Sequence, residues 1–551
     1  PIERRMRWGA SRTEFVRPVH WLLMIFGKEV VPGTVLGLAA GNISYGHRFH
    51  RPGPVTISSA GKYAEFLRQA YVVADFSERR ELIRNSVTEV ATRQGGSAVI
   101  DEDLLSEVTA LVEWPVVLPG RFDERFLAMP SEALISSMKE HQKYFHVVDK
   151  KGALIPVFIT VANIDSRDPD RIIAGNERVI LPRLADAEFF YQTDLKTPLV
   201  QQREKLRQVV FQEKLGSIYD KTERVALLAR TLAPHCGADP ELAGQAAELA
   251  KSDLVSEMVN EFETLQGVMG AHYARAEGLD PALGNALAEQ YLPRFSGDVL
   301  PQSPIGKTLA IADRIDTLVG IFAIGERPTG SSDPFALRRA SLAVLRILVE
   351  HEIDLDLLCL LRQSAAQYQD IVDSIDSIPK QVLTYMLERF HSWYVEEGVA
   401  TNVVLAVLAS DLSNPLDIST RIRAVADFTQ RPESSALAAA NKRVANILDK
   451  QSSNNTGAEL NRSLLVAEAE QALAGRLADL SLETDKLVQE GCYAQALTQL
   501  ASLHEPVDRF FDDVMVMVDD TALRNNRLAL LWLLRKQFLQ IADISLLAVS
   551  H

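Results

Sequence analysis

LVQQREKLRQVVFQEKLGSIYDKTERVALLARTLAPHCG, residues 199–237, establishes the fold class of this chain. Its apolar residues recur at helical spacing and it contains few helix breakers, which predicts helix over most of its length. From about residue 175 onward, almost the whole sequence continues this pattern. We therefore expect a multidomain, mainly α protein with an α+β region at its N-terminal end.

The N-terminal part predicts strands as well as helices. Residues 19–37, VHWLLMIFGKEVVPGTVLG, alternate short β-prone runs with Gly and Pro turns, and residues 153–164, ALIPVFITVANI, indicate a buried strand. Between them, residues 59–95 have helical spacing and end in glycine.

Pro and Gly punctuation gives the domain boundaries. The sequence changes from mixed patterning to helical patterning near residue 175, so we expect a mixed α/β region over 1–175. The stretch GERPTGSSDP, residues 325–334, predicts a second boundary, between helical domains over 176–325 and 326–551. Residues 450–459, KQSSNNTGAE, predict a polar loop inside the last domain.

Composition bounds the function classes. The chain has 551 residues, which is too long for a single hydrophobic core. Its formal net charge of −15 argues only weakly against a nucleic-acid partner. No run of about 20 apolar residues occurs, so no membrane span is expected. Cys236, Cys359 and Cys492 lie far apart without a CxxC pair, which argues against disulfides or a cysteine zinc site and favours the reducing cytoplasm. The first residue is Pro1 and no signal peptide is visible, which predicts a chain trimmed at its start.

An arginine-rich stretch near the N-terminus has two interpretations. Five arginines fall between Arg4 and Arg17, with Trp8 and Trp21 close by. Such residues hold phosphates and stack on bases, or they form a solvated edge beside a buried tryptophan.

Two histidine motifs also leave alternatives open. GHRFHRP, residues 46–52, contains His47 and His50, and KEHQKYFHV, residues 139–147, contains His141 and His146. Zinc normally takes four ligands, and no carboxylate or cysteine is placed obviously close, so a basic surface or structural histidines compete with a metal site.

The order YDKTERVALLART, AAELAKSDLVSEM and IADRIDTL resembles the HD family of helical metal phosphohydrolases. That family uses one histidine, a His-Asp pair and a later aspartate as ligands. Here Lys221 and Ser252 take the places of histidines, while Asp253 and Asp313 match the aspartates. Two carboxylates alone would bind a divalent ion weakly, so the resemblance implies a degenerate HD-like domain without hydrolase chemistry or a metal.

Other catalytic signatures are lacking in the sequence. Gly306-Lys307-Thr308 resembles the end of a phosphate-binding loop, but the required earlier glycine is Pro301. There is no Gly-x-Gly-x-x-Gly, and no Ser/His/Asp triad can be assigned. We assign no catalytic residue and expect a chain that binds.

The C-terminal stretch 505–543 predicts two helices separated by a short acidic break. Arg524, Arg527 and Arg535 fall near one face of the second helix, whose LALLWLL run should be deeply packed. This row is either the solvated edge of a packed helix or a nucleic-acid surface.

Seven motifs occur in the order MRWG, FVRPVHWL, GHRFH, EHQKYF, DPFALRRA, NKRVANIL and FFDDVMVMVDDTALRNNRLALL. Together they resemble the β subunit of bacterial heterotetrameric glycyl-tRNA synthetase over essentially the entire chain, without the extreme N-terminal segment of that family.

The resemblance implies an α₂β₂ enzyme that joins glycine to tRNA(Gly) using ATP. The α subunit would carry the catalytic core with ATP and Mg²⁺, and this chain would hold no cofactor and would recognise tRNA. The resemblance also implies an HD-like domain near the acceptor end and a C-terminal helical anticodon-binding domain like that of arginyl-tRNA synthetases. Arg524, Arg527 and Arg535 would then bind the anticodon arm, with Asn525 and Asn526 as base readers.

In arginyl-tRNA synthetases that domain carries an Asp-Ala-Leu-Arg run, which we match to Asp333–Arg338 with a Pro-Phe insertion. DPFALRRA would begin its first long helix, capped by Ser331, Ser332 or Asp333 and with Pro334 in the first helical position. Arg338 and Arg339 would pair with acidic residues of neighbouring helices or reach tRNA.

Two other classes of function remain as alternatives: an HD-type hydrolase of nucleotides, and a helical scaffold that binds no nucleic acid.

Overall fold

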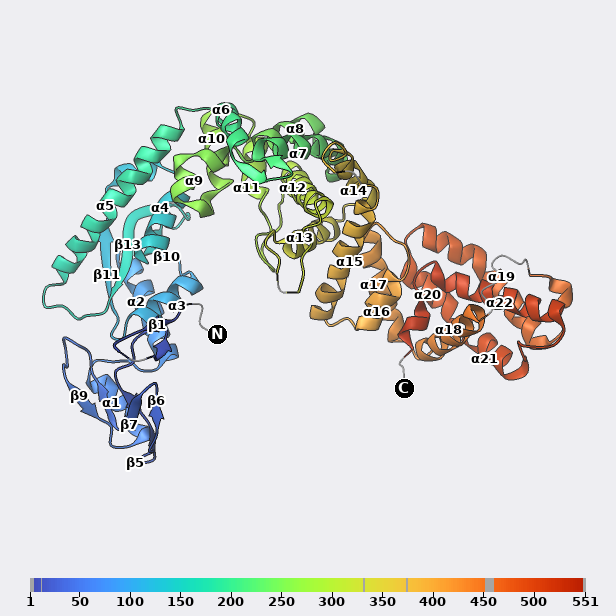
Figure 1. Cartoon of the computed structure of the whole chain (residues 1–551), viewed down its shortest axis with the longest axis horizontal. Coiled ribbons are helices and arrows are strands. Elements are labelled where there is room, and N and C mark those ends of the chain that lie inside the picture. Colours follow the sequence, from blue (N-terminus) through green and yellow to red (C-terminus); the bar gives the residue numbers. More distant parts are fainter. Residues whose placement is uncertain (1–3, 11, 331, 373–374, 451–459, 549–551) are drawn as a thin grey trace. The chain divides into compact units, whose positions relative to one another are not determined.

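The computed structural model describes residues 4–10, 12–330, 332–372, 375–450 and 460–548. The candidate cap Ser331 and nearly all of the predicted loop 450–459 lie outside these ranges. The chain divides into two units, one of Pro1–Thr197 with Ser256–Leu265 and one of Pro198–Val255 with Gln266–His551. The predicted fold class holds in outline, because most of the described chain is helical and the larger sheet lies in the first unit (Figure 1).

The first unit begins with short strands, as predicted for residues 19–37. β3 pairs parallel with β7, while β4–β5, β6–β7 and β8–β9 pair antiparallel. Their bounds, with those of the antiparallel pair β1–β2, are β1 Met6–Arg7, β2 Glu14–Phe15, β3 Leu22–Leu23, β4 Ile25–Phe26, β5 Glu29–Val30, β6 Thr34–Val35, β7 Leu38–Gly41, β8 Ile43–Tyr45 and β9 Pro54–Thr56.

A four-stranded antiparallel sheet follows, in the order β10 (Ser97–Ala98), β12 (Phe145–Val148), β13 (Leu154–Ala162), β11 (Val116–Arg121). β13 confirms the strand predicted over 153–164. Its Phe158 lies opposite Gly120, where a Cβ would come within 2.2 Å of the ring, so only glycine fits.

α2 (Phe76–Arg93) and α3 (Glu102–Leu111) pack on this sheet through one apolar core that includes Ile83, Val87 and Phe145. Asp75 and Asp101 cap the two helices by accepting N–H bonds from Glu78 and Leu104. The helix predicted over 59–95 is therefore α1 and α2, separated at residues 70–75. The other helices of this unit are α1 Tyr63–Gln69, α4 Ser131–Ser136, α5 Pro169–Asp194 and α9 Glu257–Glu261.

Residues 256–265 return to the first unit from far along the chain. Asp194, at the end of α5, accepts N–H bonds from Glu257 at 2.9 Å and Met258 at 3.0 Å, which holds the start of α9. Phe262 is buried and stacks on His141 with ring centroids 5.7 Å apart.

The second unit is almost entirely helical. Its helices are α6 Leu199–Lys205, α7 Ile218–Leu232, α8 Pro240–Leu249, α10 Val268–Ala276, α11 Pro281–Glu289, α12 Pro304–Ala323, α13 Leu337–Glu350, α14 Leu357–Ala366, α15 Ile378–Glu396, α16 Thr401–Leu408, α17 Pro415–Thr429, α18 Ser434–Asp449, α19 Glu468–Gln489, α20 Tyr493–Ala501, α21 His504–Asp513 and α22 Thr521–Leu539. The hairpin β14 (Val210–Gln212) and β15 (Gly216–Ser217) interrupts the helix expected over 199–237.

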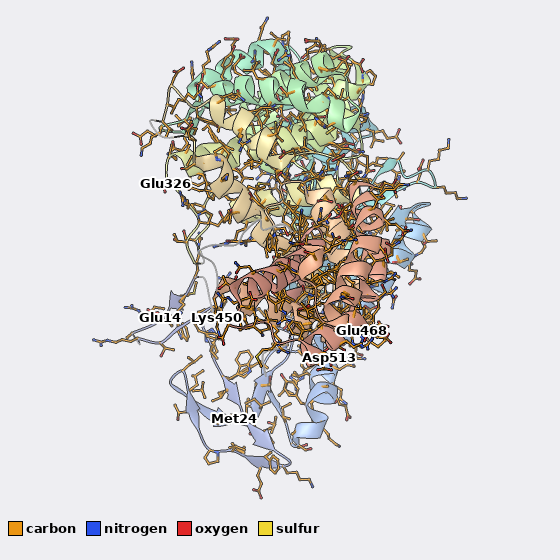
Figure 2. All side chains as sticks on the ribbon, turned by 90° about the vertical axis from the view of Figure 1, so that its right-hand side faces the viewer. Glu14, Met24, Glu326, Lys450, Glu468 and Asp513 are labelled. Atoms are coloured by element: carbon orange, nitrogen blue, oxygen red, sulfur yellow. The ribbon has the colours of Figure 1, made fainter. Side chains whose placement is uncertain are left out.

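The C-terminal helices α18–α22 form a bundle, and Figure 2 labels the first residue of α19, Glu468, and the last residue of α21, Asp513. Leu528, Leu530, Leu531 and Leu534 of α22 are buried, which confirms the deep packing predicted for LALLWLL. None of the described helices is long and apolar enough to cross a membrane.

Candidate functional site

The residues predicted from the HD resemblance lie together inside the second unit. Lys221 on α7 is buried, and its Nζ lies 3.3 Å from Asp313 Oδ1 and 3.2 Å from Asp316 Oδ2, both on α12. It also donates to Thr317 Oγ1 at 2.7 Å. A lysine ammonium therefore lies at the position to which the HD resemblance assigned a histidine ligand.

A second buried cation, Lys251, was not predicted. Its Nζ lies 3.4 Å from the other oxygen of Asp313 and 4.0 Å from the centre of the Tyr291 ring. Burial alone would raise the pKa of Asp313, but the charges of Lys221, Lys251 and Arg314 hold that pKa below its usual range. Burial lowers the pKa of Lys251, and Asp313 opposes this shift. The only sequence signal was a lysine directly before Ser252.

Asp253 has a different role in the same region. Its Oδ2 accepts N–H bonds from Gly267 at 2.5 Å and Gly270 at 2.9 Å, so it caps the first turn of α10. Burial raises the pKa of Asp253 to about 6, although these two N–H groups act in the opposite direction. Ser252, beside it, is fully buried.

This arrangement is suited to structure more than to metal chemistry. Asp313 is already compensated by two ammonium groups, and Asp253 is used as a helix cap. Within the described ranges, no group of three His, Cys, Asp or Glu side chains is placed to hold a metal ion. Arg314 donates to backbone carbonyls of Gln290, Tyr291 and Pro293.

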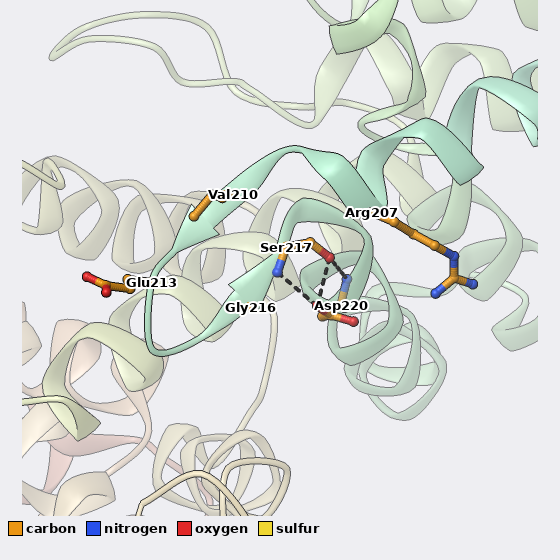
Figure 3. Close-up of a pocket in the computed structure, with 6 residues that line it drawn as sticks. All are labelled: Arg207, Val210, Glu213, Gly216, Ser217 and Asp220. Atoms are coloured by element: carbon orange, nitrogen blue, oxygen red, sulfur yellow. Dashed lines mark hydrogen bonds between the residues drawn. The ribbon is translucent and has the colours of Figure 1, made fainter.

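A cavity of about 380 Å³ lies near the N-terminal end of α7 (Figure 3). Ser217 and Asp220 form a capping box there. Gly216 has φ +87° and a Cβ would lie 2.6 Å from the Asp220 carboxylate, so both its backbone conformation and the available space favour glycine. The cavity is lined by Arg207, Val210, Glu213, Gly216, Ser217 and Asp220. Its charges have both signs, and they do not specify a ligand.

The first histidine motif, residues 46–52, serves as an internal anchor. His47 is buried, and its Nε2 lies 2.6 Å from the carbonyl of Asn163, while its Nδ1 accepts N–H bonds from Phe49 and His50 at 3.2 Å. His50 Nε2 accepts an N–H bond from Asp165 at 2.9 Å. These contacts support the structural interpretation and leave no nitrogen of His47 for a metal.

In the C-terminal bundle, two of the predicted tRNA-binding residues face inward. Arg527 is 8% exposed and pairs with the fully buried Glu470 of α19, and it donates to the carbonyl of Met515 at 2.7 Å. Asn526 is buried and exchanges two hydrogen bonds with the backbone of Asn461, at 2.8 and 3.1 Å. The expected surface row is therefore wrong for Arg527, and the expected base reader Asn526 is buried, because α22 is packed on both sides.

The other predicted residues of α22 are half-buried. Arg524 donates to the carbonyl of Val518 at 3.1 Å, and Arg535 pairs with Asp543 at 3.1 Å. Asn525, the residue directly after Arg524, is also half-buried.

Comparison with known proteins agrees with the order of motifs. Residues 1–409 match the family model of the glycyl-tRNA synthetase β subunit. The chain belongs to the glycyl-tRNA synthetase β-subunit family. Relatives named glycine–tRNA ligase β subunit are 54% identical in Marinobacter nauticus, over all of this chain and 79% of the relative, and 51% identical in Pseudomonas aeruginosa, over 99% and 80%.

Members of this family are subunits of an aminoacyl-tRNA ligase, and the name β subunit implies an α partner. In this β subunit, residues 437–547 match the DALR anticodon-binding domain. That match corrects our placement of the Asp-Ala-Leu-Arg run, because Asp333–Arg338 lies outside it and Asp520–Arg524, Asp-Thr-Ala-Leu-Arg, lies inside it.

In this β subunit, α13 begins at Leu337, three residues later than predicted. Asp333 accepts N–H bonds from Leu337 at 2.8 Å and Arg338 at 3.0 Å, so Pro334 lies before the helix. Arg338 donates to the carbonyl of Gly330 at 2.5 Å and Arg339 to that of Arg294 at 3.2 Å. Both arginines therefore contact backbone carbonyls.

Proposed function

We propose that this chain is the tRNA-binding β subunit of a cytoplasmic α₂β₂ glycyl-tRNA synthetase. The α subunit would bind ATP, Mg²⁺ and glycine and would catalyse both the activation of glycine and its transfer to tRNA. This chain would position tRNA(Gly). The observation that carries the proposal is the anticodon-binding match over 437–547, which falls on a helical bundle with a firmly packed α22.

The bundle offers a rigid base for RNA contacts. Glu470 and Arg527 fix α19 to α22, and Asn526 fixes the start of α22 to residue 461. Arg524 and Asn525 are partly exposed beside these anchors, and they are our candidates for phosphate and base contacts.

Charging of tRNA(Gly) by this chain alone, by the α subunit alone and by both together tests the division of labour. We expect glycine-dependent exchange of pyrophosphate into ATP from samples that contain α, and charging only from the mixture. Exchange by this chain free of α would contradict the proposal. Loss of tRNA affinity with rising salt would separate it from a scaffold that binds no nucleic acid.

Two adjacent asparagines provide a matched test of anticodon reading. We expect Asn525→Ala to reduce discrimination among anticodon variants while the protein stays stable. Asn526→Ala should lower the melting temperature, because it leaves backbone groups of Asn461 without their side-chain partner. Binding titrations with anticodon variants and thermal unfolding of both proteins distinguish these roles. Unchanged discrimination by Asn525→Ala would remove it from the site.

A further inference from the structure

The loop Gly46–Pro52 is held rigidly from within. The side chains of His47 and His50 form hydrogen bonds with the backbone of Asn163 and Asp165. The backbone N–H of His47 donates to the carbonyl of Ala70 at 2.9 Å. A Cβ on Gly46 would lie 2.8 Å from that of Ala70, so the loop lies directly against the end of α1. The two histidines therefore turn inward, and the residues between and after them turn outward.

The outward residues are aromatic and basic. Phe49 is 72% exposed, although its ring leans on His47 with centroids 6.1 Å apart. Arg48 and Arg51 are exposed, and across the described residues neither guanidinium forms an ion pair with a carboxylate. Because no carboxylate of the described residues pairs with them, these two arginines make the loop locally basic beside its exposed ring, although the chain carries a net charge of −15.

A row of rings continues from this loop. His50 stacks on Tyr71 with centroids 4.7 Å apart and planes 28° apart, and Tyr71 meets the edge of Trp114 at 5.1 Å. Tyr71 has φ +60°, a left-handed conformation that is unfavourable for a tyrosine. Strained residues of this kind cluster at functional sites, where the surrounding structure holds them in place.

We propose that Arg48, Phe49 and Arg51, backed by His50 and Tyr71, bind the unpaired 3′ end of tRNA. Exposed rings stack on nucleobases of any sequence, and neighbouring arginines neutralise the phosphates between them. The proposal rests on the proposed function, in which the anticodon loop is assigned to residues 437–547. The D and T loops of a folded tRNA pair with each other, so the 3′ end is the other single-stranded segment whose bases are free to stack.

Binding to two RNAs tests this surface, with the chain in complex with its α subunit. One RNA is intact tRNA(Gly), and the other lacks the unpaired 3′ nucleotides. We expect Phe49→Ala to weaken binding of the intact tRNA about tenfold, as for the loss of one stacked base, and to change binding of the trimmed tRNA less than twofold. Phe49→Tyr should bind like the wild type, and Arg48→Ala should reduce the salt slope by about one.

Phe26→Ala is the matched control, because Phe26 is 83% exposed in the same unit and lies outside the loop. It should bind both RNAs like the wild type. Equal effects of Phe49→Ala on the two RNAs, or none, would overturn the proposal. The proposal would also be overturned if Phe49→Ala lowered the melting temperature or prevented assembly while the folded protein kept its normal tRNA affinity. That result would indicate that a protein segment covers this surface. If the wild type itself binds no tRNA, the proposed function fails instead.

Discussion

Asp253 is a fully buried carboxylate that is used as a helix cap, and its ionisation should be visible in the pH dependence of stability. Burial raises its pKa to about 6, so the folded chain holds this proton more tightly than the unfolded chain. Its contribution to stability is full below about pH 4 and is lost as the pH rises through 6. The difference is about 3 kcal/mol. We expect Asp253→Asn to remove this slope.

Urea unfolding of both proteins between pH 4.5 and 7.5 measures the effect. Asp313 does not interfere, because its pKa lies below its usual range and its contribution is lost only at lower pH. Parallel pH profiles for wild type and Asp253→Asn would show that the carboxylate is less buried than its contacts indicate.

Arg527 provides a second prediction for a single residue. Removal of one member of a buried ion pair leaves the other charge uncompensated, so Arg527→Ala should lower the free energy of unfolding by about 3–5 kcal/mol. Lys536→Ala, an exposed cation on the same helix, should change it by less than 0.5 kcal/mol, about the usual limit for surface sites. Chemical denaturation of the two proteins checks this. Equal stability would mean that Glu470 finds another partner.

Among the elements, α13 depends on a cap that lies outside the helix. We expect Asp333→Ala to destabilise the second unit by about 1 kcal/mol, because two N–H groups of the first turn lose their acceptor. Ser332→Ala, at the exposed neighbouring position, should have no measurable effect. Thermal unfolding distinguishes them, and equal melting temperatures would show that water replaces the carboxylate.

The elements also show how far periodicity carries a prediction. Helical spacing located most of α7 within residues 199–237, and the strand over 153–164 was placed to within two residues. The hairpin β14–β15 was missed because its strands have only three and two residues. Pro334 suggested the wrong helix start, since Ala336 adopts φ +52° and delays the helix to Leu337. Neither feature leaves a periodic signal.

The residues of the candidate sites also fall into those that the sequence located and those that it missed. The positions Lys221, Asp253 and Asp313 were found from the order of motifs, but Lys251 and Glu470 were not, because charge compensation across helices depends on packing. A charged row on a helix was read as surface, although Arg527 is buried by α19 on the other side.

For the whole molecule, the division into units predicts how the chain can be cut. A fragment that ends at Thr197 lacks residues 256–265, which complete the first unit. Adding these residues through a Gly-Ser linker should raise its melting temperature and its resistance to protease. The same fragment with Phe262→Ala should lose most of the gain, about 3 kcal/mol, because Phe262 is buried. Identical protection of all three fragments would contradict this division.

The return of residues 256–265 also sets an order of events during synthesis. The first unit leaves the ribosome early, but its final segment follows only after the 68 residues from Pro198 to Leu265 have been translated. At about 5–20 residues per second, this takes roughly 3–14 s. During that interval the apolar surface that Phe262 later covers is open to solvent. The nascent chain at this length is therefore the species on which we expect chaperones to act.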